Sequence, residues 1–364
     1  MKNVILTAFI VFIASACRHP IEIIGQGDVT SASGNRDCLY ADYQASKPNC
    51  SANDVDGKYL ETYYPVATAG YKFSAWGNYC NKVDGIDECS FNIPGKAVKD
   101  ADLEQAPPLV AYFRKEMSDD QVALLMGHSF FEPFSARLPE QAALAGFENH
   151  QQHKFFSGGG GGAPIAFWND KESSNHKGIK KAMDSGDITL LGMTTYPNDF
   201  DYALSGYKNW IDYALNNNAD FDVFIGMPWS TNPAAIEFKA YQEGWDDYHR
   251  NEVHATIDIL REEYPGLDFY CIPYGQAGVA LKELFEAGEL AEITQLQGDW
   301  DTSVFTDDLG HPGKILIDLG SLIWLRAVYG ADLQDLDFGL SYSINMENLA
   351  DEILNKHDHR YDAP

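Results

Sequence analysis

The feature that most constrains the fold of this chain is an alternation of short apolar runs with longer amphipathic stretches in its C-terminal part. The apolar runs have the length of buried strands and lie at residues 122–126, 153–156, 188–193, 222–227 and 268–272. The amphipathic stretches have helical spacing and include residues 138–147, 202–215, 234–260 and 279–287. Such alternation indicates βαβ units, so the sequence predicts an α/β domain with a mainly parallel five-stranded sheet.

Residues 18–115 lack this alternation of apolar and amphipathic stretches. They show no sustained helical or strand period and are rich in Gly, Asn, Asp, Ser and Tyr, which predicts loops and short elements. The cysteines of this extension are Cys38, Cys50, Cys80 and Cys89. Pairing neighbours gives Cys38–Cys50 and Cys80–Cys89, although four cysteines allow three connectivities. We therefore expect a disulfide-rich N-terminal extension before a domain at residues 116–364.

Residues 1–17 predict export. Lys2 precedes an apolar run at residues 4–13, and small residues then lead to Cys17. This is the pattern of a secretory signal peptide, which is too short to span a bilayer. Its Ala-Ser-Ala-Cys ending resembles a bacterial lipoprotein signal, in which Cys17 is lipidated, and simple cleavage after Ala16 is the alternative. We expect a cell-envelope lipoprotein that meets the membrane only through this anchor, or otherwise a periplasmic or secreted protein.

The net charge of the chain limits the kinds of partner that it is expected to bind. Its 364 residues include 54 Asp+Glu and 26 Lys+Arg, a formal net charge of −28. A nucleic-acid-binding protein needs a basic face that displaces counterions from phosphates. The composition therefore argues against a nucleic-acid partner and favours a solvated acidic surface.

A serine follows the first apolar run, in Gly127-His128-Ser129. Ligands of open parallel sheets bind beyond the carboxyl ends of the strands, so residues at this position are candidates for a site. A serine on a sharp turn between a strand and a helix exposes its hydroxyl to a base. The alternative for Ser129 is a structural serine that caps the next helix.

Two further segments could stabilise an oxyanion. The glycine run at residues 158–162 follows the second apolar run, and glycine lets backbone N–H groups approach a ligand closely. A flexible linker is the alternative. Asn198 follows the third run and could donate a second hydrogen bond from its side-chain amide, unless it belongs only to a turn and helix cap.

The sequence Asp307-Asp308-Leu309-Gly310-His311 precedes a predicted helix at residues 315–329. Asp308 and His311 are three residues apart, close enough for the carboxylate to orient the imidazole. His311 would then serve as a general base. If Asp308 only caps the helix, the adjacent Asp307 is the next candidate.

The remaining histidines and the last cysteine suggest no further site. The pairs His150/His153 and His357/His359 have ligand-like spacing but lack an accompanying Cys or Glu ligand set, so we expect surface histidines. Cys271 lies inside the fifth apolar run and is expected to act as a buried small hydrophobe. No metal or organic cofactor is expected.

Taken in order, these blocks resemble the SGNH (GDSL-like) hydrolase family, over roughly residues 120–330. The resemblance implies a three-layer α/β/α, flavodoxin-like fold. It also implies Ser129 as the nucleophile and Asp308 with His311 as the acid and base. The implied oxyanion donors are the amides of Ser129 and Gly162, or of a neighbouring glycine, with the Asn198 side chain.

The function implied by this resemblance is that of an exported serine esterase acting on a small-molecule or glycan ester. Carbohydrate O-deacetylation is common among exported bacterial members of the family. Trp168, Trp229 and Tyr196 follow strand ends and could form an aromatic rim for a sugar, or pack as ordinary core residues. The alternatives are a non-catalytic surface-binding lipoprotein of the same fold, and an adhesive lipoprotein whose working part is the cysteine-rich extension.

Overall fold

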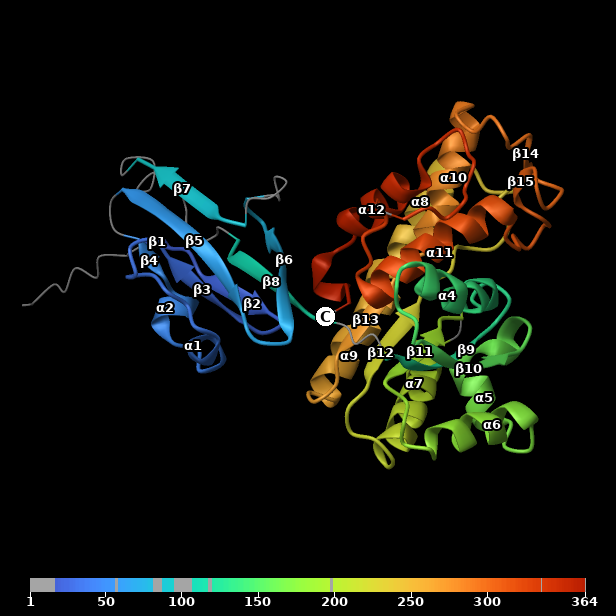
Figure 1. Cartoon of the computed structure of the whole chain (residues 1–364), viewed down its shortest axis with the longest axis horizontal. Coiled ribbons are helices and arrows are strands. Elements are labelled where there is room, and N and C mark those ends of the chain that lie inside the picture. The colour runs from blue at the N-terminus through green and yellow to red at the C-terminus, as the bar shows by residue number, and fades with distance from the viewer. Residues whose placement is uncertain are drawn as a thin grey trace, which may run out of the picture. The chain divides into compact units, whose positions relative to one another are not determined.

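The computed structural model describes residues 17–55, 58–80, 87–94, 107–116, 120–196, 199–334 and 336–363. The chain divides into two compact units, Met1–Glu116 and Met117–Pro364 (Figure 1). Residues 1–16 of the predicted signal peptide and Asn198 lie outside the described residues, so export and lipidation of Cys17 stay predictions. Within the described part of the chain, no helix is long and apolar enough to cross a membrane.

The C-terminal unit is built on a five-stranded sheet in which every neighbouring pair is parallel. In chain order the strands are β9 (Val122–Gly127), β10 (Gln151–Phe156), β11 (Leu190–Thr194), β12 (Asp222–Gly226) and β13 (Phe269–Ile272). Their spatial order is β10-β9-β11-β12-β13. This confirms the predicted α/β fold with a parallel five-stranded sheet. The next strand after β9 in sequence, β10, pairs with one edge of β9, and the following strand, β11, pairs with its other edge. The topological switch point therefore lies between β9 and β11.

Helices cover both faces of this sheet and complete a three-layer α/β/α arrangement (Figure 1). Successive strand residues point to opposite faces, so Leu125 packs in one core and Leu124 in the other. The first core includes residues of α4 (Glu132–Leu144), α10 (Gly275–Ala287), α11 (Lys314–Tyr329) and α12 (Met346–Lys356). The second includes residues of α5 (Pro164–Asn169), α6 (Ser174–Met183), α7 (Phe200–Leu215), α8 (Phe238–Tyr248) and α9 (Ala255–Glu263).

One predicted helix has an interruption. The amphipathic pattern at residues 234–260 corresponds to α8 and α9, joined by the π-helical turn η3 (His249–His254). A small parallel pair, β14 (Gln295–Gln297) and β15 (Ser303–Phe305), precedes α11. The sequence analysis predicted neither the π-helical turn nor the β14–β15 pair.

The N-terminal unit contains more regular structure than the sequence predicted. Its two three-stranded sheets have the orders β2-β8-β6 and β3-β5-β7. The strands are β2 (Ile21–Ile24), β3 (Gly27–Ser31), β5 (Tyr59–Ala67), β6 (Tyr71–Gly77), β7 (Cys89–Ile93) and β8 (Leu109–Lys115). The expectation of loops is wrong here, because the first half of β5 alternates buried with exposed residues over one face.

Smaller elements and two disulfides complete this unit. The helices α1 (Tyr40–Gln44) and α2 (Pro48–Ser51) flank the sheets, and β1 (Cys17–Arg18) pairs with β4 (Asp54–Val55). Disulfides join Cys38 to Cys50 and Cys80 to Cys89, as the pairing of neighbours predicted. Since disulfides persist in oxidising compartments, they favour an oxidising, extracellular environment.

Candidate functional site

Ser129 lies on the turn between β9 and α4, at the topological switch point. The N–H groups of Phe131 and Glu132 both donate to the His128 carbonyl, at 2.9 and 3.0 Å, and close the turn. A Cβ on Gly127 would lie 2.5 Å from the Phe131 ring, so this tight turn requires glycine at position 127. The Ser129 side chain therefore emerges at the carboxyl end of the sheet, partly exposed.

His311 brings the serine and a carboxylate into one hydrogen-bonded chain. Its Nε2 lies 2.9 Å from Ser129 Oγ, and its Nδ1 lies 2.6 Å from Asp307 Oδ2. With the Nδ1 proton donated to the carboxylate, Nε2 carries the lone pair that faces the serine hydroxyl. Such a geometry allows His311 to accept the Ser129 proton.

The structure places Asp307, and not the predicted Asp308, beside the His311 ring. Asp307 Oδ1 accepts the backbone N–H groups of Gly310 and His311, both at 3.0 Å, while Oδ2 meets the ring. Gly310 has φ +93°, a left-handed conformation that folds the loop back over the carboxylate. Asp308 Oδ1 instead accepts a hydrogen bond from Gln297 Nε2 at 2.8 Å. The prediction for Asp308 is therefore corrected to its neighbour.

The surroundings of Asp307 favour its charged form. Partial burial of the carboxyl opposes ionisation. Hydrogen bonds from the His311 backbone and ring, and from the Gly310 N–H, outweigh that effect and hold the pKa of Asp307 below its usual range. Asp307 is thus an anion at neutral pH and can stabilise a protonated His311 ring.

Aromatic packing fixes the loop that carries His311. The edge of Phe130 meets His311, with ring centroids 5.2 Å apart at 88°, and Phe130 stacks on Trp229 at 5.0 Å. The Trp229 indole N–H donates to the Gly310 carbonyl at 2.8 Å. Only 3% of Trp229 is exposed, so this residue supports the loop and is not part of an open aromatic rim.

His128 links the serine turn to the segment directly after β11, a role that the sequence analysis did not predict. Its Nδ1 accepts the Phe130 N–H at 3.2 Å, so its Nε2 donates to the Thr195 carbonyl at 2.8 Å. Burial lowers the pKa of His128, which keeps the ring neutral. The sequence did contain a signal for a role of His128, namely its position directly before the candidate nucleophile.

The glycine run approaches the serine turn closely. A Cβ on Gly162, the last residue of η2 (Gly159–Gly162), would lie 2.7 Å from the Gly127 carbonyl oxygen and from His128 Cα. Only glycine permits this approach. The Tyr196 ring packs against His128, with centroids 5.8 Å apart, and borders the same loop at Gly160.

Two other predicted residues lie elsewhere. Trp168 packs edge-on against Trp210, with centroids 4.9 Å apart, and beneath the Lys180 ammonium. These contacts belong to the helical layer of α5, α6 and α7. His357 was expected on the surface but is buried, and its Nε2 lies 3.5 Å from Sγ of the buried Cys271.

Comparisons with known proteins give fold-level similarities only. No family model and no curated protein matches the chain. A protein from Parabacteroides merdae described as a candidate GDSL-like lipase is 13% identical, with 58% of this chain and 97% of that one covered and a TM-score of 0.37.

Two more solved structures are similar at the same level. A DUF4886 family protein from Bacteroides uniformis is 13% identical over 64% of this chain and 95% of its own, with a TM-score of 0.42. The periplasmic domain of a Salmonella Paratyphi A lipopolysaccharide acetyltransferase is 14% identical over 56% and 82%, with a TM-score of 0.31. Sequence identities and TM-scores this low support no functional assignment, so the function has to be argued from the site itself.

Proposed function

We propose that the C-terminal unit is a serine hydrolase of carboxylic esters. One observation carries this proposal: a single imidazole, His311, lies within hydrogen-bond distance of both Ser129 Oγ and Asp307 Oδ2. A serine is a weak nucleophile unless an adjacent base removes its proton, and the base in turn needs an orienting group.

In the proposed reaction, Ser129 Oγ attacks the ester carbonyl carbon while His311 Nε2 takes the hydroxyl proton. His311 then gives this proton to the leaving alcohol as the tetrahedral intermediate collapses to an acyl-enzyme. A water molecule, deprotonated by the same nitrogen, hydrolyses the acyl-enzyme and restores Ser129. Asp307 stays ionised throughout and stabilises the transient imidazolium.

The oxyanion of each tetrahedral intermediate needs fixed hydrogen-bond donors. The backbone amides of Ser129 and Gly162 are the proposed donors, and the close approach of Gly162 to the serine turn supports the second. The Asn198 side chain stays the proposed third donor, on the sequence resemblance alone.

The proposed substrates are short-chain esters, with O-acetylated carbohydrates of the cell exterior as the favoured class. Disulfides in the N-terminal unit support an extracellular or periplasmic location, where such glycans occur. The partly exposed Tyr196 beside the glycine loop offers one aromatic surface for a sugar ring.

The test is turnover of p-nitrophenyl acetate by the full chain, followed by acetate release from acetylated polysaccharides. We expect turnover that Ser129→Ala abolishes, because that variant lacks the nucleophile but keeps the turn. Absence of turnover on every ester, in a protein shown to be folded, would contradict the proposal. That result would favour the alternative, a non-catalytic binding protein of this fold.

A further inference from the structure

A second cluster of reactive side chains lies at the sheet edge formed by β13. The cluster consists of His249, His254, Cys271 and His357, all buried. One potential ligand atom from each residue lies within 4.8 Å of the others. The ester chemistry proposed above uses none of them.

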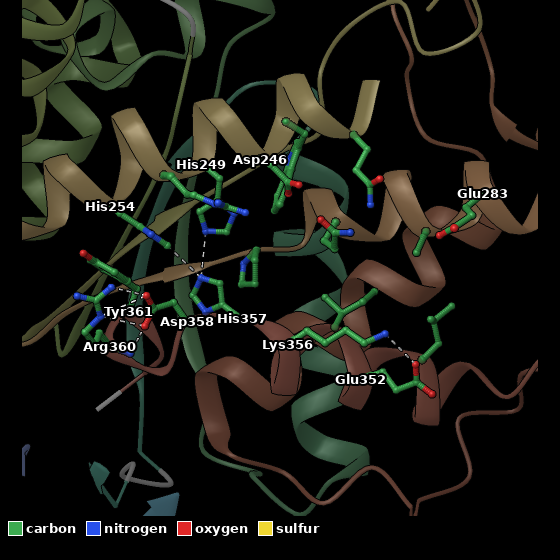
Figure 2. Close-up of a pocket in the computed structure, with 18 of the residues that line it drawn as sticks. Asp246, His249, His254, Glu283, Glu352, Lys356, His357, Asp358, Arg360 and Tyr361 are labelled. Atoms are coloured by element: carbon green, nitrogen blue, oxygen red, sulfur yellow. Dashed lines mark hydrogen bonds and ion pairs between the residues drawn. The ribbon is translucent and has the colours of Figure 1, made fainter. Parts of the chain in front are cut away.

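The local backbone explains why two of these histidines face the same point. His249 and His254 are five residues apart, which in an α-helix would separate their directions by about 140°. They are the end residues of the π-helical turn η3, whose wider i→i+5 turn brings them to one side. Their ring centroids lie 4.3 Å apart, and Figure 2 shows both rings directed toward His357.

His357 is the centre of the cluster. Its Nε2 lies 3.0 Å from His249 Nε2, 3.4 Å from His254 Nε2 and 3.5 Å from Cys271 Sγ. Tetrahedral zinc requires nitrogen ligands about 3.3–3.4 Å apart and nitrogen–sulfur pairs about 3.5–3.6 Å apart. The three distances from His357 are close to this geometry. No two ligand atoms are more than 4.8 Å apart, so the widest pair needs to close by at most about 1.2–1.5 Å.

A carboxylate holds the opposite side of the His357 ring. Asp362 Oδ1 lies 2.6 Å from His357 Nδ1, and its other oxygen lies 2.7 Å from His359 Nδ1. Metal-binding histidines are commonly oriented by such a carboxylate, which also fixes the tautomer. With Nδ1 hydrogen-bonded to Asp362, Nε2 of His357 has a single hydrogen-bonding position left, whether it carries a proton or a lone pair. That one position cannot serve both imidazoles and the thiol that surround it.

We propose that His249, His254, His357 and Cys271 bind one zinc ion in a closed tetrahedral site that stabilises the C-terminal unit. Four protein ligands leave no open position, which is typical of structural zinc. The ion joins η3, strand β13 and the segment after α12, which are distant in sequence. On binding, the Cys271 thiol loses its proton to solvent and the thiolate bonds to the metal.

The charge balance of the site supports this proposal. One zinc ion carries two positive charges, and the Cys271 thiolate and the buried Asp362 carboxylate supply two negative ones. The three histidines also line a cavity with both polar and apolar side chains, which offers a route for the ion (Figure 2).

Metal analysis of the full chain tests the proposal. We expect about one zinc per chain after purification and dialysis. After chelator treatment, titration with Co²⁺ should give the visible bands of a tetrahedral site and a near-ultraviolet thiolate-to-cobalt band. Cys271→Ser should remove the thiolate band and weaken zinc binding at least about tenfold, and Asp362→Asn should weaken it about 10- to 100-fold.

His176→Asn is the matched control, because His176 is also a buried histidine of this unit and hydrogen-bonds the Phe167 carbonyl. This variant should bind zinc like the wild type, and so should Ser129→Ala, which separates this proposal from the esterase. A folded wild-type chain that takes up neither zinc nor cobalt would overturn the proposal. So would a thiolate-to-cobalt band that survives Cys271→Ser.

Discussion

In the N-terminal unit, one disulfide joins Cys38 to helix α2 and the other joins Cys80 to strand β7, beside a core rich in tyrosine and phenylalanine. In the C-terminal unit, helices bury both faces of a parallel sheet, and the described cysteine, Cys271, is a free thiol. Small cores are often supplemented by covalent cross-links, whereas a large two-sided core rarely needs them. The disulfides, which depend on redox conditions, and the residues of the proposed reaction therefore lie in separate units of this chain.

The polar groups of the two units differ in the same way. In the N-terminal unit, His19, Asn53, Tyr59 and Tyr63 form a buried hydrogen-bonded network. In the C-terminal unit, Ser129, Asp307 and His311 remain partly exposed at the carboxyl ends of the strands. The first network is enclosed by the protein, whereas the second is open to the substrate of the proposed reaction.

The largest expected effect concerns the carboxylate of the C-terminal unit. Asp307→Asn should lower kcat of ester hydrolysis by about 10⁴-fold, because an amide neither holds the productive tautomer of His311 nor stabilises its cation. Asp308→Asn is the matched control and should leave kcat nearly unchanged, since Asp308 contacts Gln297. Equal losses in the two variants, or a larger loss for Asp308→Asn, would refute the role given to Asp307.

The next largest effect concerns the Cys38–Cys50 disulfide, whose cysteines are 12 residues apart in sequence. Replacing both residues by serine should lower the free energy of local unfolding by about 3 kcal/mol. Hydrogen exchange of peptides from β3 and β5 measures this change. Ester turnover of the same variant should stay within about twofold of the wild type, because the proposed reaction uses no residue of this unit. Unchanged exchange in β3 and β5 would show that the disulfide does not support the unit.

A smaller effect is expected from pH acting on His19. Burial, aided by Arg36, lowers the pKa of His19 to about 4, below the reference near 6.5 of the unfolded chain. The unfolded state therefore binds the extra proton between these values. The contribution of His19 is complete above pH 6.5 and is lost progressively as pH falls toward 4, with about 2 kcal/mol lost by pH 5.

Hydrogen exchange of β5 at pH-corrected rates measures this loss. His19→Asn is the control, because Asn can replace the hydrogen bond between Nδ1 and the Tyr59 hydroxyl but does not titrate. The pH dependence between 6.5 and 5 should become flatter in this variant. An unchanged profile would assign the acid sensitivity to another group.

The sequence predicted the sheet of the C-terminal unit well, for a physical reason. The strands β9, β11, β12 and β13 are buried on both faces and read as continuous apolar runs, whereas the edge strand β10 is largely exposed and only its end is apolar. Each predicted run overlaps its observed strand. The strands of the N-terminal unit were missed because Tyr59–Ala67 mixes Glu, Thr and Tyr with few aliphatic residues. Its half-buried face is recognisable only by alternation, which a search for apolar runs does not detect.

The site was predictable only in part. The positions of Ser129 and of the glycine run follow from strand ends, but the choice between Asp307 and Asp308 depends on the conformation of Gly310. The His249–His357 cluster could not be predicted from spacing, because its residues are up to 108 positions apart. A five-residue spacing also lies on one helix face only where a π-helical turn forms.

The most direct test of the central claim is the position at which a fluorophosphonate probe labels the full chain. Such probes react with serines that an adjacent base has activated. Peptide mapping should find a single label, on Ser129, and no label in Ser129→Ala or in residues 17–116. A label on another serine that persists in Ser129→Ala, or no label on a preparation that hydrolyses p-nitrophenyl acetate, would contradict the assignment of Ser129 as the nucleophile.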